Sequence, residues 1–238
     1  MHNATEMGLN YTGAKMSPLD SEQQLKAARE VPPDIAGDEQ KIALVRSSHI
    51  DDADSIGSVP LPGSAKGMLK TALNKLVGVS PEVLIDKLGE RLAFERTGTR
   101  LYEALIAKAQ AMECDREILN TLERFHHEEM EHFKLLVEAL EKLGADPSAM
   151  TPSADVMGVT SMGLLQVISD PRTNWAQSLN ALLTAELSDN AGWQMLIELA
   201  RISGQSGIAD SFQHPFAQEQ IHLATVKQWL NDEITRQV

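Results

Sequence analysis

The chain contains two short stretches in which a glutamate is followed three positions later by a histidine. The first lies within HHEEMEH at residues 126–132, and the second is EQIH at residues 219–222. Residues i and i+3 lie on the same face of a helix, so each pair can reach one ion. Carboxylate oxygens combined with imidazole nitrogens suit iron or manganese. A single pair of this kind is a weak motif, so its partners elsewhere in the chain decide its meaning.

Helical phase divides the first stretch into an inner and an outer set. At about 100° per residue, Glu129 and His132 share a face with apolar residues, namely Leu122, Phe125, Phe133 and Leu136. His126 falls at the edge of this face and Met130 on its flank. The outer set, which is predicted to lie at the surface, consists of His127, Glu128 and Glu131. Helical phase therefore leaves Glu129 and His132 as the candidate ligands of this stretch.

Helical phase also places a glutamate within an apolar stripe on each of four long helical segments. Glu219 and His222 share one such stripe, and the other two segments carry the lone glutamates Glu95 and Glu186. Glu129 follows Glu95 by 34 positions, and Glu219 follows Glu186 by 33. Seven positions after each lone glutamate stands an aromatic residue, Tyr102 or Trp193. This pattern indicates an internally repeated helical hairpin, two copies of which would close one dinuclear site.

Four carboxylates on inward faces require compensation, because a buried and unpaired carboxylate is very costly. Two divalent cations would balance the four negative charges, and two neutral imidazoles would complete the coordination. The sequence therefore predicts a site for two iron ions, or alternatively manganese. Its predicted ligands are Glu95, Glu129, His132, Glu186, Glu219 and His222.

The segments that carry these residues have recognisable ends. Ser80, Pro81 and Glu82 form a helix start, Gly144 is a good C-terminal residue, and Pro215 starts or kinks the last segment. Long helices are predicted over 80–111, 115–143, 172–202 and from 208 or 215 to 236. A connection over 144–171 contains a predicted short helix at 155–168, and no segment reads as a strand. The predicted fold is all-α, a four-helix bundle with one long crossover.

Residues 1–79 differ from the predicted bundle of residues 80–238. Up to residue 66 they are rich in Ser, Gly, Pro, Asp and Ala, with a short helix predicted over 17–30 and extended chain around 31–40 and 57–64. A helical pattern follows at 67–78. We expect an extended N-terminal arm with short helices that wraps its own bundle or a neighbouring copy. The alternatives are a floppy tail and a docking peptide for another protein.

Composition limits the possible partners and location. The 238 residues carry a net charge of −13, which disfavours nucleic acid and anionic membranes as partners. No stretch approaches the roughly 18 apolar residues of a membrane span, and the N-terminus lacks the apolar core of a signal peptide. Cys114 is the single cysteine, which excludes an internal disulfide and any CxxC site. We therefore expect a cytoplasmic protein.

With its two ExxH pairs and two preceding glutamates, the chain resembles the ferritin-like di-iron carboxylate superfamily of ferritins, bacterioferritins and rubrerythrins. The resemblance implies Glu129 and Glu219 as bridging ligands, Glu95 and Glu186 as terminal carboxylates, and one histidine on each metal. It also implies that Tyr102 hydrogen-bonds a ligand or passes an electron. Asp189 stands where rubrerythrins have an extra glutamate, so it is a possible further ligand. Met130 stands where bacterioferritins bind haem, although a packed methionine is the commoner role.

The resemblance implies a di-iron oxidoreductase that reacts with O2 or H2O2, of ferroxidase or peroxidase type, acting as a homodimer or a higher homo-oligomer. The alternatives are an iron storage protein, which requires a hollow cage, and a dimanganese catalase. A helical partner-binding protein with a vestigial site is a further alternative. The six candidate ligands are all present, which favours a working site over a vestigial one.

Overall fold

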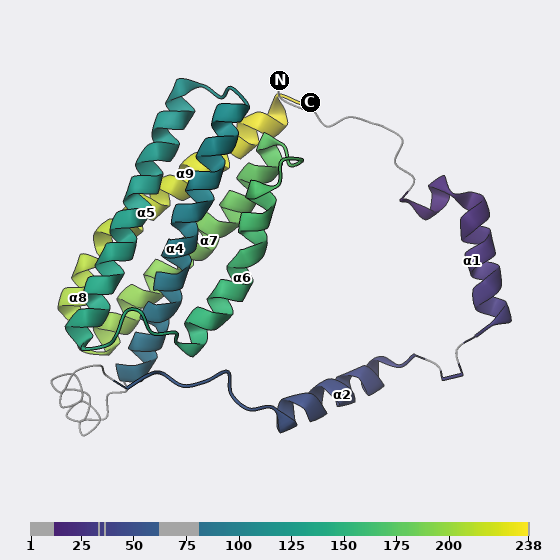
Figure 1. The fold of residues 1–238 in the computed structure, drawn as a ribbon, viewed down its shortest axis with the longest axis horizontal. Helices are drawn as coiled ribbons and strands as arrows, with labels where there is room; N and C mark the ends of the chain where they lie inside the picture. The colour runs from purple at the N-terminus through teal and green to yellow at the C-terminus, as the bar shows by residue number, and fades with distance from the viewer. Residues whose placement is uncertain (1–11, 33, 36, 62–80, 238) are drawn as a thin grey trace. The chain divides into compact units, whose positions relative to one another are not determined.

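The computed structural model describes residues 12–32, 34–35, 37–61 and 81–237, and those residues are helical with no strand (Figure 1). The N-terminal part contains the short 3-10 helix η1 (Ala14–Met16), α1 (Pro18–Glu30) and α2 (Glu39–Asp52). The helices of the bundle part are α4 (Pro81–Ala111), α5 (Arg116–Leu143), α6 (Pro152–Ser169), α7 (Trp175–Ile202), α8 (Ser206–Ser211) and α9 (Gln213–Thr235). The predicted cap Ser80 and the predicted helical pattern at 67–78 lie outside the described residues. Within the described residues, no helix combines the length and the hydropathy of a membrane span.

The predicted four-helix bundle is confirmed. Helix α4 packs against α5, and α7 packs against α9. The two hairpins meet mainly through α4 and α7, and α5 and α9 are also in contact, though less extensively (Figure 1). The connection between the hairpins carries α6, which lies against both α4 and α7. This long crossover places the two halves of the predicted repeat in one bundle.

Local chemistry explains where these helices begin and end. Gly144 ends α5 with a φ of 84°, a left-handed conformation that glycine adopts without strain. Asn174 and Gln177 form a reciprocal capping box at the start of α7. The last predicted segment is divided into α8 and α9, and Pro215 lies in the first turn of α9. A proline is tolerated in that turn because its missing N–H would have no helical partner there.

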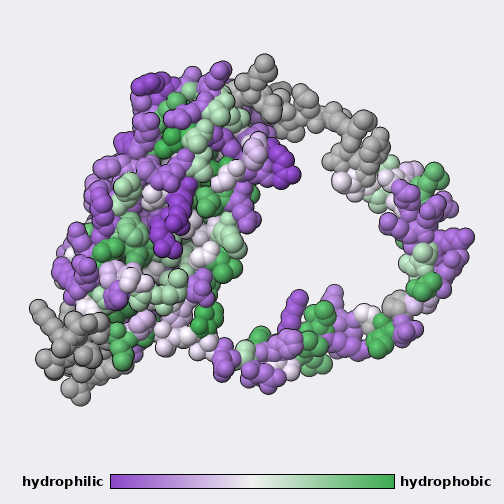
Figure 2. Space-filling view, in the orientation of Figure 1, coloured by the Kyte–Doolittle hydropathy of each residue, from purple (hydrophilic) through white to green (hydrophobic). Residues whose placement is uncertain are grey.

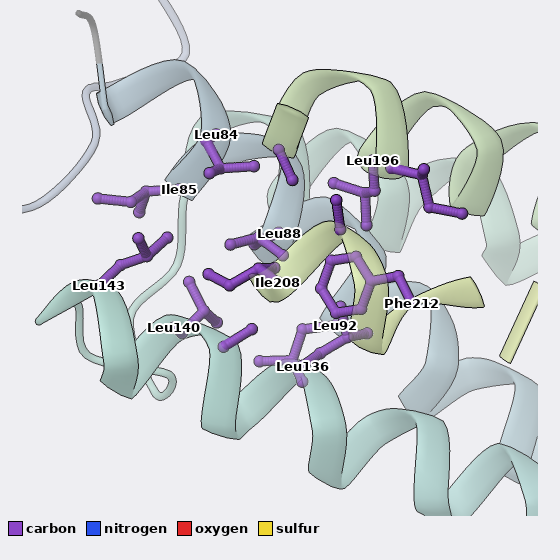
Figure 3. Packing of buried hydrophobic residues seen from close by; sticks show 14 of the residues in the cluster. Leu84, Ile85, Leu88, Leu92, Leu136, Leu140, Leu143, Leu196, Ile208 and Phe212 are labelled. Carbon is purple, nitrogen blue, oxygen red and sulfur yellow. The ribbon is translucent and has the colours of Figure 1, made fainter. Parts of the chain in front are cut away.

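The hydrophobic core consists of two clusters, one on each side of the layer that contains the ionisable residues. One cluster joins the start of α4, the end of α5, the end of α7 and α8. Figure 3 shows its side chains, including Leu88, Leu140 and Phe212, turned toward one another. The other cluster joins the end of α4 with the starts of α5 and α7 and the end of α9. The polar layer is thus closed above and below by aliphatic and aromatic packing.

The N-terminal helices form a unit separate from the bundle. Helix α1 confirms the helix predicted over 17–30, whereas α2 was not predicted. Asp38 caps α2 by accepting a hydrogen bond from the backbone N–H of Gln40 at 2.8 Å. Neither helix has a buried residue, and Figure 2 shows apolar residues interspersed with hydrophilic ones along them. The segment 56–61 belongs to the bundle unit, where Val59 packs against the first core cluster.

Candidate metal centre

The six candidate ligands lie together in the middle of the bundle. Helix α4 contributes Glu95 and α7 contributes Glu186, while α5 and α9 each contribute the glutamate and histidine of an ExxH pair. Each of the six is at most 2% exposed. Their ligand atoms form two overlapping groups, within each of which all atoms lie within 4.8 Å of one another. The groups are Glu95, Glu129, His132 and Glu219, and then Glu129, Glu186, Glu219 and His222.

The two groups have matching geometry. His132 Nδ1 lies 2.8 Å from Glu219 Oε1 and 3.8 Å from Glu95 Oε2. His222 Nδ1 lies 3.3 Å from Glu219 Oε2 and 3.5 Å from Glu129 Oε1. Glu186 Oε2 is 3.9 Å from the same nitrogen. Both histidines therefore turn Nδ1 toward the carboxylates, and Glu129 and Glu219 are the two residues shared by both groups.

Among the residues that the structure describes, many buried polar atoms at this centre have no well-aligned hydrogen-bond partner. They include both carboxylate oxygens of Glu95 and Glu219, one oxygen each of Glu129 and Glu186, and the Nδ1 atoms of both histidines. Buried polar atoms in folded proteins are otherwise nearly always hydrogen-bonded. A pair of divalent cations would satisfy these atoms together and offset the buried negative charge. The residues present therefore fit a dinuclear metal centre.

Without cations, the site retains protons. Burial raises the pKa of Glu95 well above its usual value, and the charges of Asp189 and Glu129 raise it further. Burial likewise raises the pKa of Glu186, and the charge of Glu219 adds to the effect. Burial alone would lower the pKa of His222, but the hydrogen bond to Glu128 and the nearby carboxylates of Glu129 and Glu219 raise it above its ordinary value. Cations must displace these protons, because metal ligands bind in their deprotonated form.

Metal binding is therefore expected to release protons and to strengthen as pH rises from about 6 to about 8, a range that spans the usual pKa of histidine. The sign follows from the raised pKa values of Glu95, Glu186 and His222, since each holds a proton that competes with the cation. Calorimetric titration in buffers of different ionisation enthalpy measures the number of protons released. A binding constant that stays unchanged over this pH range would contradict the assignment.

The outer nitrogen of each histidine has a polar partner from the opposite helix. His222 Nε2 donates to Glu128 Oε2 at 2.7 Å, and His132 Nε2 donates to Gln218 Oε1 at 3.1 Å. The prediction that Glu128 is a surface residue is therefore wrong, because its side chain is only 17% exposed and reaches across to α9. Glu128 and Gln218 each immediately precede a shared glutamate, so alignment of the two halves of the repeat could have identified them.

Glu128 is charged in this setting. Burial would raise the pKa of its carboxyl group, but the hydrogen bond and charge of His222 lower it below the ordinary value. Contacts with Arg124 and Gln218 act in the same direction. A carboxylate that accepts from the outer N–H of a ligating histidine orients the ring and increases its basicity.

Tyr102 contacts a candidate ligand directly. Its hydroxyl group donates to Glu186 Oε1 at 2.6 Å, and its ring meets His222 edge to face, with 6.0 Å between the ring centroids. Trp193, its counterpart in the repeat, lies edge to face against His132 at 5.6 Å. The predicted hydrogen bond of Tyr102 to a ligand residue is thus present, while electron transfer through Tyr102 stays a prediction.

Replacing Tyr102 with phenylalanine is expected to lower the free energy of unfolding of the metal-free protein by about 1–3 kcal/mol, because Glu186 loses its buried donor. The aromatic packing against Phe125 and His222 would be retained. Urea denaturation measures the change, and Thr184→Val on α7 is a control for loss of an exposed hydroxyl group. Equal small effects of both substitutions would mean that the hydroxyl group contributes little.

Asp189 belongs to neither ligand group and is paired with Arg91. The Arg91 guanidinium donates through Nη1 to Asp189 Oδ1 at 2.6 Å and to the Asp189 carbonyl oxygen at 3.1 Å. Its Nε atom lies 3.5 Å from Glu95 Oε1. A side chain at Gly192 would collide with the Arg91 guanidinium, and one at Gly98 would collide with the Glu129 carboxylate. These glycines leave the space that the buried charged groups occupy.

The remaining residues of HHEEMEH lie farther from the centre. The side chains of His127 and Glu131 are 71% and 52% exposed, as predicted for a surface position. His126 is partly buried, with its Nε2 3.4 Å from Glu103 Oε1. Met130 is exposed on the outer side of α5, and its haem-binding role stays a prediction.

Comparison with known proteins agrees with this architecture. The sequence model of a protein family described as the ferritin-like domain matches residues 85–234, which is more than half of the chain. A solved structure described as ferritin-like, diiron-carboxylate proteins from Bacillus anthracis str. Ames has 18% identity and a TM-score of 0.48. That similarity covers 62% of this chain and 94% of the other. No curated protein matches the chain. On the family match, the chain belongs to the ferritin-like family.

Proposed function

We propose that this protein is a di-iron oxidoreductase that reacts with O2 or H2O2, with ferroxidase or peroxidase activity. The observation that carries the proposal is the pair of overlapping ligand groups that share Glu129 and Glu219. Ligation by four carboxylates and two histidines suits iron, with manganese as the alternative metal. When bound, two iron ions would supply the electrons that reduce the oxidant.

The protein's own residues would perform three tasks at such a centre. Glu129 and Glu219 would hold both ions at a fixed separation, because each reaches both groups. Glu128, Gln218 and Tyr102 would fix the orientation of ligand side chains through the hydrogen bonds described above. The two apolar clusters that close the polar layer would exclude bulk water from it.

Burial of the centre favours a small oxidant. All six candidate ligands are at most 2% exposed, so a bulky organic molecule could not contact them without movement of the helices. A groove of about 580 Å³ between α5 and α9 reaches the centre, because the candidate ligand His132 is among its lining residues, together with Gln218. O2, H2O2 and ferrous ions are small enough to pass from such a groove to the centre.

The reaction can be tested by mixing the anaerobic, ferrous-loaded protein with either O2 or H2O2 in a stopped-flow spectrometer. We expect iron oxidation to be faster than that of free ferrous ions under the same conditions, and to be lost in the Glu219→Ala variant. Preference for one oxidant would distinguish ferroxidase from peroxidase chemistry. Oxidation no faster than in protein-free solution would reject the proposed activity.

A further inference from the structure

The two halves of the candidate centre have matching ligands but different surroundings. Each half has one terminal glutamate, one histidine and the two shared glutamates. The outer nitrogen of His222 donates to a carboxylate, Glu128, whereas that of His132 donates to a neutral amide, Gln218. The internal repeat is therefore broken at one pair of equivalent positions, and this difference changes the charge next to each metal position.

Charge favours a cation in the half that contains His222. The Glu128 carboxylate increases the basicity of the His222 ring, which a neutral glutamine does less effectively for His132. In the other half, the Arg91 guanidinium lies 3.5 Å from Glu95 Oε1 and opposes a nearby cation, although Asp189 offsets part of its charge. Tyr102 acts in the opposite direction by donating to Glu186. The Tyr102 hydroxyl group carries no net charge, however, whereas Glu128 adds a full negative charge beside the His222 position.

Accessibility differs between the halves in the same direction. The groove between α5 and α9 is lined by both outer partners, Glu128 and Gln218, but of the two candidate ligand histidines only His132 is among its lining residues. The His222 ring is instead covered by the buried Phe125 ring, with 3.9 Å between the centroids. A cation that arrives through the groove would meet the His132 half first and would also leave from that half.

We propose that the two metal positions are unequal. The position formed by Glu186 and His222 fills first and retains its ion, while the position formed by Glu95 and His132 fills second and exchanges its ion through the groove between α5 and α9. Glu128 and Gln218 are the positioning residues that set this difference. The inference rests on the proposed dinuclear centre and adds an order of loading to it.

The test is an anaerobic titration of the full-length, metal-free protein with Co²⁺, followed by its visible absorption and by calorimetry. Cobalt avoids oxidation of the probe, and its absorption reports on the geometry of each occupied position. We expect two steps whose affinities differ by about 10- to 100-fold, the range measured when partners of ligating histidines are altered.

Two reciprocal substitutions separate charge from hydrogen bonding. Glu128→Gln retains an acceptor for His222 but removes the charge. The Co²⁺ affinity of the first step should therefore fall by about 10-fold or more, toward the affinity of the second step. Gln218→Glu should strengthen the second step and leave the first nearly unchanged. Glu131→Gln is the matched control, because Glu131 also lines the groove yet bonds Lys134 at 2.6 Å rather than a candidate ligand.

A crystal loaded with one equivalent of Co²⁺ identifies the position that fills first. Anomalous scattering between Glu186 and His222 would support the proposal, and scattering beside His132 would overturn it. Two steps of equal affinity, or equal effects of Glu128→Gln and Glu131→Gln, would overturn the inequality while leaving the dinuclear centre intact. Failure of the wild-type protein to bind Co²⁺ would reject both the inequality and the centre on which it rests.

Discussion

Replacing Glu129 with alanine is expected to abolish the binding of two metal ions per chain. Glu129 belongs to both ligand groups, so its removal deprives each position of a ligand and removes one buried negative charge. The loss of affinity should exceed the 10- to 100-fold typical for residues that only contact a ligand. Elemental analysis of the gel-filtered protein after loading measures the result.

His127→Ala is the matched control for this substitution. His127 lies two positions away on the same helix, but its side chain is 71% exposed and contacts Glu131 rather than the centre. This variant should bind as much metal as the wild-type protein. Equal losses in both variants would mean that the inward and outward faces of α5 are wrongly assigned.

The second large effect is expected at Arg91. Replacing it with methionine leaves Asp189 buried without its cationic partner and next to the other carboxylates, which should destabilise the metal-free protein by about 3–5 kcal/mol. Burial raises the pKa of the Asp189 carboxyl group above its ordinary value, and the charge of Arg91 acts against that rise, so loss of Arg91 removes the nearest charge that stabilises the ionised form. Urea denaturation of the metal-free protein measures the change.

Two further variants define the cause of that loss. Replacing Arg91 with methionine and Asp189 with leucine together should restore much of the stability, because a buried ion pair can often be exchanged for apolar residues without loss. Arg96→Met removes an exposed arginine from the same helix and should change stability by less than about 0.5 kcal/mol. A similarly small effect of Arg91→Met would show that the ion pair contributes little.

The bundle and the six candidate ligands could be predicted because both depend on patterns within single helices. Glu95, Glu129, Glu186 and Glu219 each interrupt an apolar stripe, and the polar residues outside the stripes indicate which face is buried. The similar spacing from Glu95 to Glu129 and from Glu186 to Glu219 then indicates which helices form each hairpin. The structure places the six side chains together, as this reasoning required.

The roles of Glu128 and Gln218 could not be derived from helical phase. Each lies about 100° from the residue that follows it, so phase alone assigns it to a flank. Its contact with a histidine depends on how closely α5 and α9 approach each other, a distance that the periodicity of one helix does not contain. Asp189 illustrates the same limit, because phase directs it inward but only the packing of α4 against α7 pairs it with Arg91.

Helix α2 was missed for a different reason. Ile42, Leu44 and Val45 of α2 point in different directions around the helix, so no apolar stripe distinguishes it from the polar segments around it. Its start signal is the single cap Asp38, and caps of this kind also occur in turns.

The central claim, that six buried side chains hold two metal ions, is tested most directly by one measurement. The full-length protein is loaded with ferrous iron without oxygen, gel-filtered, and analysed for iron per chain. The account predicts two iron ions in the wild-type protein, one for each ligand group. Retention of no iron would contradict the account. Two manganese ions per chain in the protein as purified, with rapid dismutation of H2O2, would contradict the assignment of iron.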